Sequence, residues 1–183
     1  MPKVAVIVGS IRKDSINKKL ARALAKLADG KLVFDTLQID DLPLFNQDDE
    51  TSPTPAVLRI KEQIRAADGV LFVTPEHNRS IPAALKNAID WASRPPKDSA
   101  FSGKVGAIIG ASRGRLSTAI AQSHLRTVAG CQLQALLTLP ETYINFTDTL
   151  IDVDANVTDE AAKKLLVRFI DALSRFIESM AKA

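Results

Sequence analysis

Residues 3–17 read KVAVIVGSIRKDSIN, and this stretch passes from a buried strand directly into a helix. Its apolar run, Val4–Val8, is typical of a strand that is covered on both faces of a parallel sheet. Backbone N–H groups at the start of a helix are unpaired, and the helix dipole favours negative charge there. We therefore expect a phosphate group at this turn, close to the side chains of Ser10, Arg12, Ser15 and Asn17.

The spacing of this turn excludes two common nucleotide-binding motifs. It contains a single glycine, so it is not the G-x-G-x-x-G fingerprint, and no Gly-Lys-Ser/Thr follows to form a P-loop. Arg12 among neutral donors suits a terminal phosphomonoester better than a triphosphate with magnesium. The alternative is a plain strand-to-helix turn with Ser15 as the N-cap. That alternative leaves Ser10, Arg12 and Asn17 in the same turn unexplained.

Short β-type runs alternate with amphipathic helical patterns along the whole chain. This alternation predicts an α/β fold, one domain over residues 1–183, with a parallel sheet covered by helices on both faces. The last helix begins at Thr158-Asp159-Glu160, where an N-cap precedes a wide apolar face. The five expected strands are Val4–Val8, Leu32–Ile39, Val70–Thr74, Val105–Ile109 and Leu133–Leu139.

Polar loops follow the first, third and fourth of these strands. In a sheet of strand order 2-1-3-4-5 these strands are neighbours, and their loops share one edge, where ligands bind in such folds. The second loop, Pro75–Pro82, contains Glu76, His77, Asn78 and Ser80. Asn78 and Ser80 offer donors and acceptors to the edge of a planar ring. His77 either contacts that ligand or is an exposed loop histidine, and we interpret the Glu76 carboxylate as structural.

The third loop, Gly110–Arg115, combines two glycines with two arginines. Glycine permits close backbone approach, and arginine clamps anions. Ser112 and Arg113 are therefore candidate ligand contacts; the alternative is a glycine turn with solvated arginines. We expect His124 to be a structural histidine, because it lies inside a helical pattern.

Composition narrows the class of protein. The chain of 183 residues is 46% hydrophobic with a formal charge of +3, and its basic residues are spread out rather than clustered. Nucleic-acid binding is therefore not expected, because the contiguous basic stripe is missing. The single cysteine, Cys131, cannot form an intrachain disulfide, and no apolar run has membrane-spanning length. These features predict a cytoplasmic protein. No metal site is expected either, because the acidic run Asp48-Asp49-Glu50 lacks the glycine and the alternating ligands of an EF-hand loop.

Three motifs resemble the NAD(P)H-dependent FMN reductase family, which includes quinone, chromate and azo-dye reductases. They are GSxRxxSxN at 9–17, PEHNxSxP at 75–82 followed by LKNAIDW at 85–91, and GAS at 110–112. His77 stands where many members have tyrosine. Arg113 stands where a small residue is common, and Ile120 and Ser123 replace an arginine and a tyrosine often found there.

The resemblance implies a flavodoxin-like fold, non-covalent FMN and a homodimer or homotetramer. Independently of it, Leu85, Ile89 and Trp91 recur at helical spacing and are mostly core, and their excess over one face makes this helix our choice for a subunit interface. It implies that the first turn binds the FMN phosphate, through Ser10, Arg12, Ser15 and Asn17. It also implies residues that line the flavin ring: Pro75, Glu76, His77, Asn78 and Ser80, with Ser112 nearby.

We predict an FMN-dependent oxidoreductase in which NADPH or NADH passes a hydride to the flavin. The reduced flavin then reduces a small-molecule acceptor, such as a quinone, chromate, azo compound or flavin, in a ping-pong cycle. No side chain is predicted to be catalytic, because the cofactor carries the chemistry, and Arg113 is predicted to bind an anionic substrate. The alternatives are a flavodoxin-like electron carrier without enzymatic activity and a nucleotide-binding regulatory protein without flavin.

Overall fold

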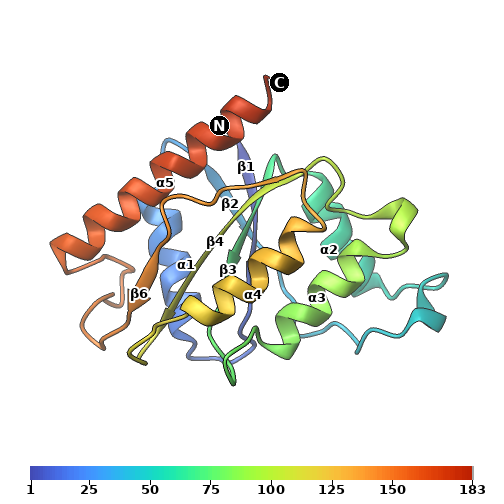
Figure 1. Ribbon diagram of the computed structural model, residues 1–183, viewed down its shortest axis with the longest axis horizontal. Helices are drawn as coiled ribbons and strands as arrows, with labels where there is room; N and C mark the ends of the chain where they lie inside the picture. Colours follow the sequence, from blue (N-terminus) through green and yellow to red (C-terminus); the bar gives the residue numbers. More distant parts are fainter. Residues whose placement is uncertain (183) are drawn as a thin grey trace.

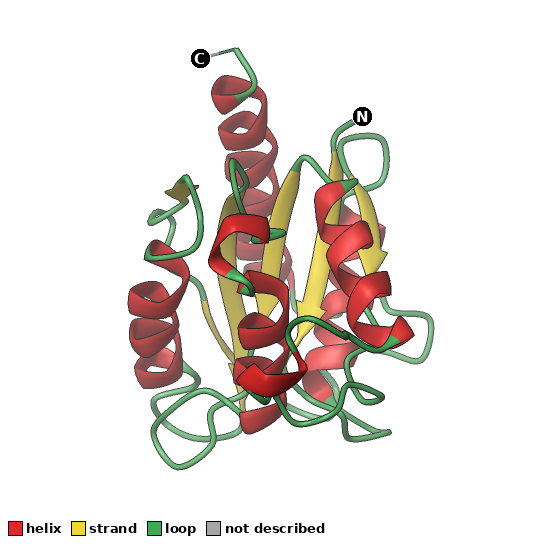
Figure 2. Cartoon of the chain, turned by 90° about the vertical axis from the view of Figure 1, so that its right-hand side faces the viewer, coloured by secondary structure: helices red, strands yellow, loops and turns green. Residues whose placement is uncertain are grey.

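The computed structural model describes residues 1–182, which form a parallel sheet between two layers of helices (Figures 1 and 2). The strand order is β2-β1-β3-β4-β5, and a sixth strand, β6, also pairs with β4. This is the predicted flavodoxin-like arrangement. The strands are β1 (Lys3–Val8), β2 (Val33–Thr36), β3 (Gly69–Val73), β4 (Val105–Ser112), β5 (Ala135–Leu136) and β6 (Tyr143–Asn145). The α-helices are α1 (Ile16–Leu27), α2 (Pro55–Arg65), α3 (Ala83–Ser93), α4 (Ala119–Gly130) and α5 (Glu160–Met180).

The central strands are buried on both faces, as their continuous apolar runs predict. Successive side chains of a strand point to opposite faces, so β1 contributes Val4 and Val6 to one core and Ala5 and Ile7 to the other. Helices α1 and α5 cover the first core, and α2, α3 and α4 cover the second. The sheet is therefore sealed on both sides, and the polar residues of its strand ends are confined to the edges.

The loops that follow β1, β3 and β4 lie along the lower edge of the molecule in Figure 1. This follows from the parallel pairing, in which Val8 is the register partner of Val73 and Val73 that of Ile109. The predicted meeting of the three loops at the carboxyl edge is thus confirmed.

The expected fifth strand, Leu133–Leu139, is wrong in its extent. Only Ala135–Leu136 pairs with the start of β4, whereas Tyr143–Asn145 pairs with its end. Pro140 has no N–H to donate to a ladder, and Leu139 is 71% exposed, so the chain leaves the sheet between the two segments.

Two further strands differ from the prediction by more than one residue at an end. β2 covers only Val33–Thr36, within the expected Leu32–Ile39. β4 extends to Ser112, so Gly110–Ser112 belongs to the strand rather than to the third loop. The pairing of Gly110–Ser112 with β6 explains this extension.

Trp91 and Ile89 of α3 belong to the core of this chain and are each 2% exposed. The Trp91 indole nitrogen donates to the carbonyl of Pro43 at 2.8 Å. These residues are therefore core, as their helical spacing predicts, and the choice of α3 as a subunit interface stays a prediction.

α5 begins where the sequence predicts, because the Asp159 carboxylate accepts a hydrogen bond from Ala162 N at 2.7 Å. Its apolar face, which includes Leu166, Phe169 and Leu173, packs into the first core. None of the helices within residues 1–182 combines the length and the apolar character needed to cross a bilayer.

Gly110 fixes the distance between β3 and β4 at the loop edge. A Cβ at this position would lie 2.1 Å from the carbonyl oxygen of Thr74 and 2.6 Å from Thr118 Oγ1. We predict that Gly110→Ala lowers the free energy of unfolding by about 3 kcal/mol or more, because backbone atoms must shift. Urea denaturation measures this change.

The matched control is Gly130→Ala, where an added Cβ would meet nothing within 4 Å. Gly130 ends α4, and alanine there is expected to be neutral or to stabilise by up to about 1 kcal/mol. Equal denaturation midpoints for Gly110→Ala and the parent protein would contradict this account of the edge.

Candidate functional site

Backbone hydrogen bonds bring the three loops together where they leave the sheet. Gly9 N donates to the carbonyl of Val73, and Thr74 N donates to that of Ile109, both at 2.9 Å. A Cβ on Gly9 would lie 3.1 Å from Leu85 Cδ2 and 3.4 Å from Pro75 Cδ. The first loop therefore starts directly against the second, and the second against the end of β4.

The first loop, residues 9–15, presents a row of free backbone donors. Ser15 is the N-cap of α1, and its Oγ accepts from Asn17 N and Lys18 N at 3.2 and 3.3 Å. Within residues 1–182, the N–H groups of residues 11–16 have no protein acceptor. Arg12 and Ser10 add a guanidinium and a hydroxyl that are likewise unpaired. This donor set fits a phosphate, because charge-assisted N–H contacts at a helix start favour an anion.

Asn17 lies in the interior, although the sequence suggested a contact with the phosphate. Its Nδ2 donates to the Ala111 carbonyl, and Ala111 N donates to its Oδ1, both at 2.9 Å. The side chain is fully buried, so the carboxamide joins the start of α1 to the end of β4. One Nδ2 hydrogen remains beyond this pair. A direct contact with a ligand therefore stays a prediction.

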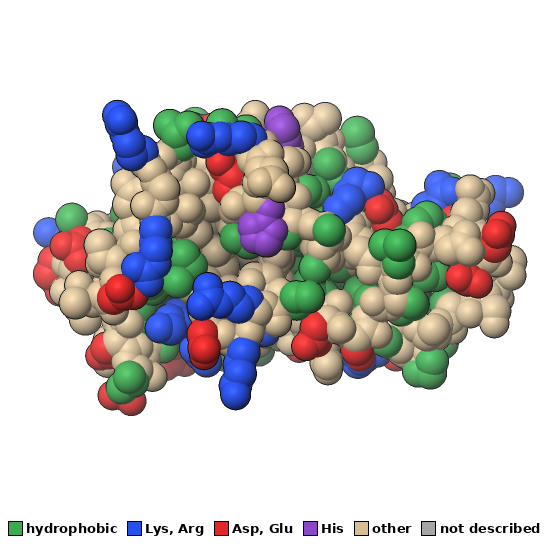
Figure 3. Space-filling view, turned by 90° about the horizontal axis from the view of Figure 1, so that it is seen from below, with side chains coloured by type: hydrophobic (Ala, Val, Ile, Leu, Met, Phe, Trp, Pro, Cys, Tyr) green, Lys and Arg blue, Asp and Glu red, His purple; other side chains and the backbone are tan. Residues whose placement is uncertain are grey.

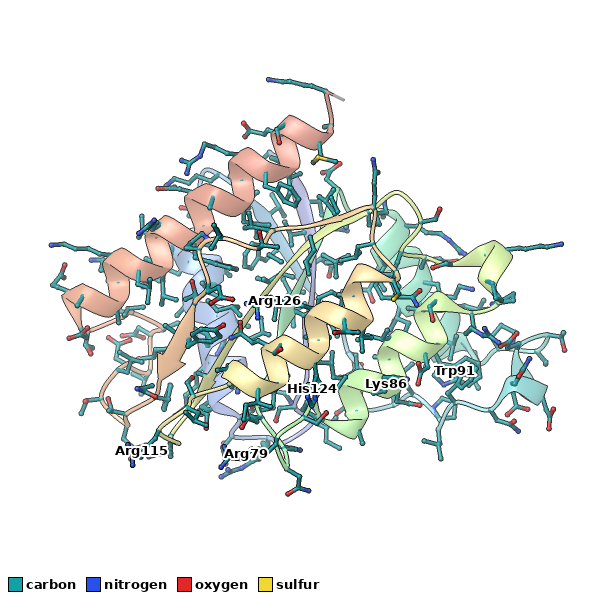
Figure 4. The ribbon with its side chains drawn as sticks, viewed as in Figure 1. Arg79, Lys86, Trp91, Arg115, His124 and Arg126 are labelled. Atoms are coloured by element: carbon teal, nitrogen blue, oxygen red, sulfur yellow. The ribbon has the colours of Figure 1, made fainter. Side chains whose placement is uncertain are left out.

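The second loop turns at His77–Ser80 in a tight hairpin. His77 and Ser80 exchange backbone hydrogen bonds, both at 2.9 Å. Asn78 and Arg79 between them have φ values of 49° and 63°, as a type I′ turn requires. Asparagine tolerates this conformation, whereas arginine is strained in it. The turn exposes the peptide groups of Asn78 and Arg79 at the lower edge, where Arg79 is seen in Figure 4.

Glu76 attaches the second loop to α4. Its Oε2 accepts from the N–H groups of Ile120 and Ala121 at 3.1 and 3.0 Å, and its Oε1 lies 3.4 Å from Arg79 Nη1. A carboxylate at a helix N-terminus satisfies unpaired donors and interacts favourably with the helix dipole. This geometry agrees with the structural interpretation of the carboxylate.

The two histidines of the chain lie near one another, across the second loop and α4. His77 is exposed; His124 is also exposed, on α4, and its Nδ1 lies 3.1 Å from Ser80 Oγ. His124 therefore has a hydrogen-bond partner, as expected of a structural histidine, although it lies on the surface. Its place in a helical pattern does not indicate that this partner is Ser80. His77, Ser80 and His124 line a hollow of about 650 Å³ together with Lys86, which is seen beside His124 in Figure 4.

The third loop is fixed by its own polar groups. Ser112 Oγ accepts from Gly114 N at 3.1 Å. Both Arg113 Nη atoms donate to the Asp148 carboxylate, and this ion pair lowers the pKa of Asp148. The Arg113 guanidinium also lies 5.8 Å from the centre of the Phe146 ring. Arg113 is therefore not a free cation, and an anionic ligand would have to compete with Asp148.

The loop edge as a whole carries more basic than acidic groups near its centre. Figure 3 shows lysine and arginine side chains around both histidines, with exposed apolar side chains between them. Within the described part of the chain, no cluster of three or more His, Cys, Asp or Glu side chains is placed to hold a metal ion. The groups left unpaired in the first loop, within residues 1–182, are N–H donors, the Ser10 hydroxyl and the Arg12 guanidinium, and these suit an anionic organic ligand.

Comparison with known proteins assigns this arrangement to a family. The family model of NADPH-dependent FMN reductases matches residues 2–148. A 2-hydroxy-1,4-benzoquinone reductase of a Burkholderia species is 48% identical over 96% of both chains. A quinone reductase of Pseudomonas putida is 42% identical over 96% of this chain and 94% of its own.

A solved structure agrees with these relatives. The flavoenzyme FerB of Paracoccus denitrificans, an NAD(P)H:acceptor oxidoreductase, superimposes with a TM-score of 0.94 at 43% identity. The match covers 98% of this chain and 99% of FerB. The fold described above is therefore shared with a known flavoenzyme.

The Glu76 contact yields a prediction about the second loop. We expect Glu76→Ala to lower the free energy of unfolding by about 1–2 kcal/mol, because two N–H groups of α4 lose their acceptor. Glu76→Gln keeps an acceptor oxygen and is expected to lose about half as much. Urea denaturation measures both changes, and a fluorescence titration shows whether FMN affinity falls with them.

Glu141→Gln is the matched control, because Glu141 makes a half-exposed ion pair with Arg126 at 3.3 Å. Its effect on stability is expected to stay below about 0.5 kcal/mol. If Glu76→Ala were as mild as Glu141→Gln, Glu76 would not hold the loop to α4.

Proposed function

Because the chain belongs to the NADPH-dependent FMN reductase family, we propose that it is an FMN-dependent NAD(P)H oxidoreductase that reduces quinones. One flavodoxin-like domain over residues 1–183 carries this activity. The observation that carries the proposal is the row of unpaired N–H groups at residues 11–16, beside a hairpin with exposed peptide groups. Such a pair of sites suits the phosphate and the ring of one flavin nucleotide.

The first loop holds the FMN phosphate. Its N–H groups, the Ser10 hydroxyl and the Arg12 guanidinium donate to the phosphate oxygens, and Ser15 orients the turn as the N-cap. Each such charge-assisted hydrogen bond contributes roughly 1.5–3 kcal/mol. Several of them account for a cofactor that is bound without a covalent link.

The second loop lines the flavin ring. Pro75 is packed near Gly9, and Asn78 presents its backbone and carboxamide to the polar edge of the ring. His77 and Ser80 flank the same turn, and Ser112 lies at the end of the neighbouring β4. When bound, FMN accepts a hydride from NADPH or NADH and passes electrons to the acceptor. The protein supplies position and electrostatics, which is all that such a reaction requires of it.

Quinones are the best supported acceptors. The relatives at 48% and 42% identity are named for hydroxybenzoquinone and quinone reduction, and they align over nearly the whole chain. The exposed hairpin leaves one side of the ring site open to flat acceptors. Chromate, azo compounds and flavins are further acceptors that such an open site would admit.

A non-enzymatic electron carrier is the second candidate, because flavodoxins share this strand order and FMN. Flavodoxin-like carriers are generally strongly acidic, whereas this chain has a formal charge of +3. The reductase is therefore favoured. We further propose a homodimer or homotetramer in the cytoplasm, the setting in which a chain with one exposed, unpaired cysteine is expected.

Anaerobic addition of NADPH or NADH to the FMN-loaded protein tests this proposal. We expect the visible absorbance of the flavin to bleach at once and to return when a quinone is added. Arg12→Ala is expected to raise the Kd for FMN by roughly ten- to a hundredfold through the loss of a charge-assisted contact. Arg175→Ala, on the exposed surface of α5, is the control and is expected to leave this Kd unchanged.

A protein that binds FMN but does not react with either nicotinamide nucleotide would be a carrier. A protein with no affinity for FMN would contradict both candidate functions and favour a regulatory nucleotide-binding protein.

Arg113 is proposed to bind anionic acceptors. Because Arg113 makes an ion pair with Asp148, substitution of the two partners should change the KM for an anionic acceptor in opposite directions. Arg113→Ala should raise the KM for chromate, because a cation is lost. Asp148→Asn should lower this KM, because it removes the competing carboxylate. Steady-state kinetics with chromate and with an uncharged quinone measure both changes, and only the chromate values should move. If chromate KM values are the same in all three proteins, Arg113 does not contact the acceptor.

A further inference from the structure

A hollow of about 420 Å³ lies on the far side of the first loop from the flavin-ring loop, between α1 and the carboxyl end of β2. We name it the β2-side hollow. Its floor and walls are apolar, formed by Val8, Ile11, Ala21, Leu37 and Ile39. It opens at the same edge of the sheet as the first, second and third loops, because Ser10 of the first loop also lines it. Its size is that of a small-molecule site.

Unpaired polar side chains surround the apolar floor of the β2-side hollow. Lys18 and Arg22 are one turn apart on α1 and line the hollow together. Neither side chain makes an ion pair or hydrogen bond within residues 1–182. Gln38 and Asp40 line the opposite side, and their side chains are likewise free of protein partners over the same range. An apolar slot with two free cations suits a flat base that carries a phosphate.

The position of the β2-side hollow relative to the first and second loops suggests that the base is one half of a dinucleotide. The sheet order runs from β2 through β1 to β3 and β4. A dinucleotide whose nicotinamide lies against the loop after β3 reaches the β2-side hollow by extending over the first loop. In the related Rossmann sheets a dinucleotide lies across the switch point with one nucleotide on each side. In this sheet the switch point lies between β1 and β3, and the β2-side hollow is on the β1 side of it.

We propose that the β2-side hollow binds the adenosine 2′-phosphate half of NADPH, with Lys18 and Arg22 on the 2′-phosphate. This inference rests on the proposed function and names the part of the molecule that selects the electron donor. Adenine lies on the apolar floor, and Gln38 offers hydrogen bonds to its polar edge. Asp40 opposes the phosphate, because a carboxylate at this strand end favours an unphosphorylated ribose. The balance of these charges sets the preference between NADPH and NADH.

The first test uses the FMN-loaded protein and fragments of the donor. Isothermal titration calorimetry is expected to show binding of adenosine 2′,5′-bisphosphate, and binding of adenosine 5′-monophosphate at least about tenfold weaker, since the latter lacks the 2′-phosphate. Inorganic phosphate at the same concentration should compete only weakly. Equal affinities for the two nucleotides would overturn the assignment.

The second test compares variants with both donors. Lys18→Ala and Arg22→Ala are each expected to raise the KM for NADPH by roughly tenfold and that for NADH by less than about twofold. Arg22→Lys should restore most of the NADPH affinity. Asp40→Asn should shift the ratio of kcat/KM values further toward NADPH. Circular dichroism spectra establish that each variant is folded.

Lys19→Ala is the matched control, because Lys19 has the same charge and lies next to Lys18 but does not line this hollow. It is expected to change neither KM by more than about twofold. If Lys19→Ala had the same effect as Lys18→Ala, general attraction of anions would explain the result and the site would be refuted.

If neither donor reduced the bound FMN of the parent protein, the proposed function itself would fail. Reduction by both donors, with NADPH and NADH KM values unchanged in Lys18→Ala and Arg22→Ala, would refute the hollow alone.

Discussion

The paired hydrogen bonds between the buried Asn17 carboxamide and the backbone of Ala111 are the constraint on which the loop edge depends. They join the first turn of α1 to the end of β4, two segments that are 94 residues apart. Both groups are removed from water, so breaking the pair leaves a buried donor and acceptor unsatisfied. The start of α1 therefore has one position relative to the sheet. The free N–H groups ahead of it are fixed in direction before any ligand arrives.

Two further contacts extend this constraint to the other loops. Gly110 allows the Thr74 carbonyl to approach β4 closely, and Glu76 fixes the second loop to the N-terminus of α4. Donors for a phosphate and peptide groups for a ring are thereby held at fixed separation. Preorganisation of this kind improves affinity because little ordering remains to be done when the ligand binds.

Much of this architecture is predictable from the sequence, because it depends on local patterns. The buried run Val4–Val8, the Ser15 cap and the Asp159 cap follow from periodicity and capping rules, and the strand order follows from the alternation of elements and the resemblance. The split between β5 and β6 was missed because it depends on Pro140 and on pairing partners far away in the chain. The buried role of Asn17 was missed for the same reason.

The side-chain partnerships of the site were the least predictable. Arg113 stands in a loop with two glycines, and the sequence around it does not indicate that Asp148, 35 residues later, neutralises it. His124 follows a helical pattern, but its contact with Ser80 depends on how α4 packs against the second loop. The types of residue in the three loops thus predict which edge of the sheet carries the site. Tertiary packing decides which charged side chains at that edge are free of ion pairs. The unpaired Lys18 and Arg22 became visible only in the folded chain.

A crystal structure of the protein with FMN tests the central claim most directly. The account predicts phosphate oxygens within about 3.2 Å of several N–H groups of residues 11–16. It also predicts that the Asn17–Ala111 pair stays intact and that the loop backbone moves by less than about 1 Å. A phosphate bound elsewhere, or an Asn17 side chain that leaves Ala111 to reach the ligand, would contradict it.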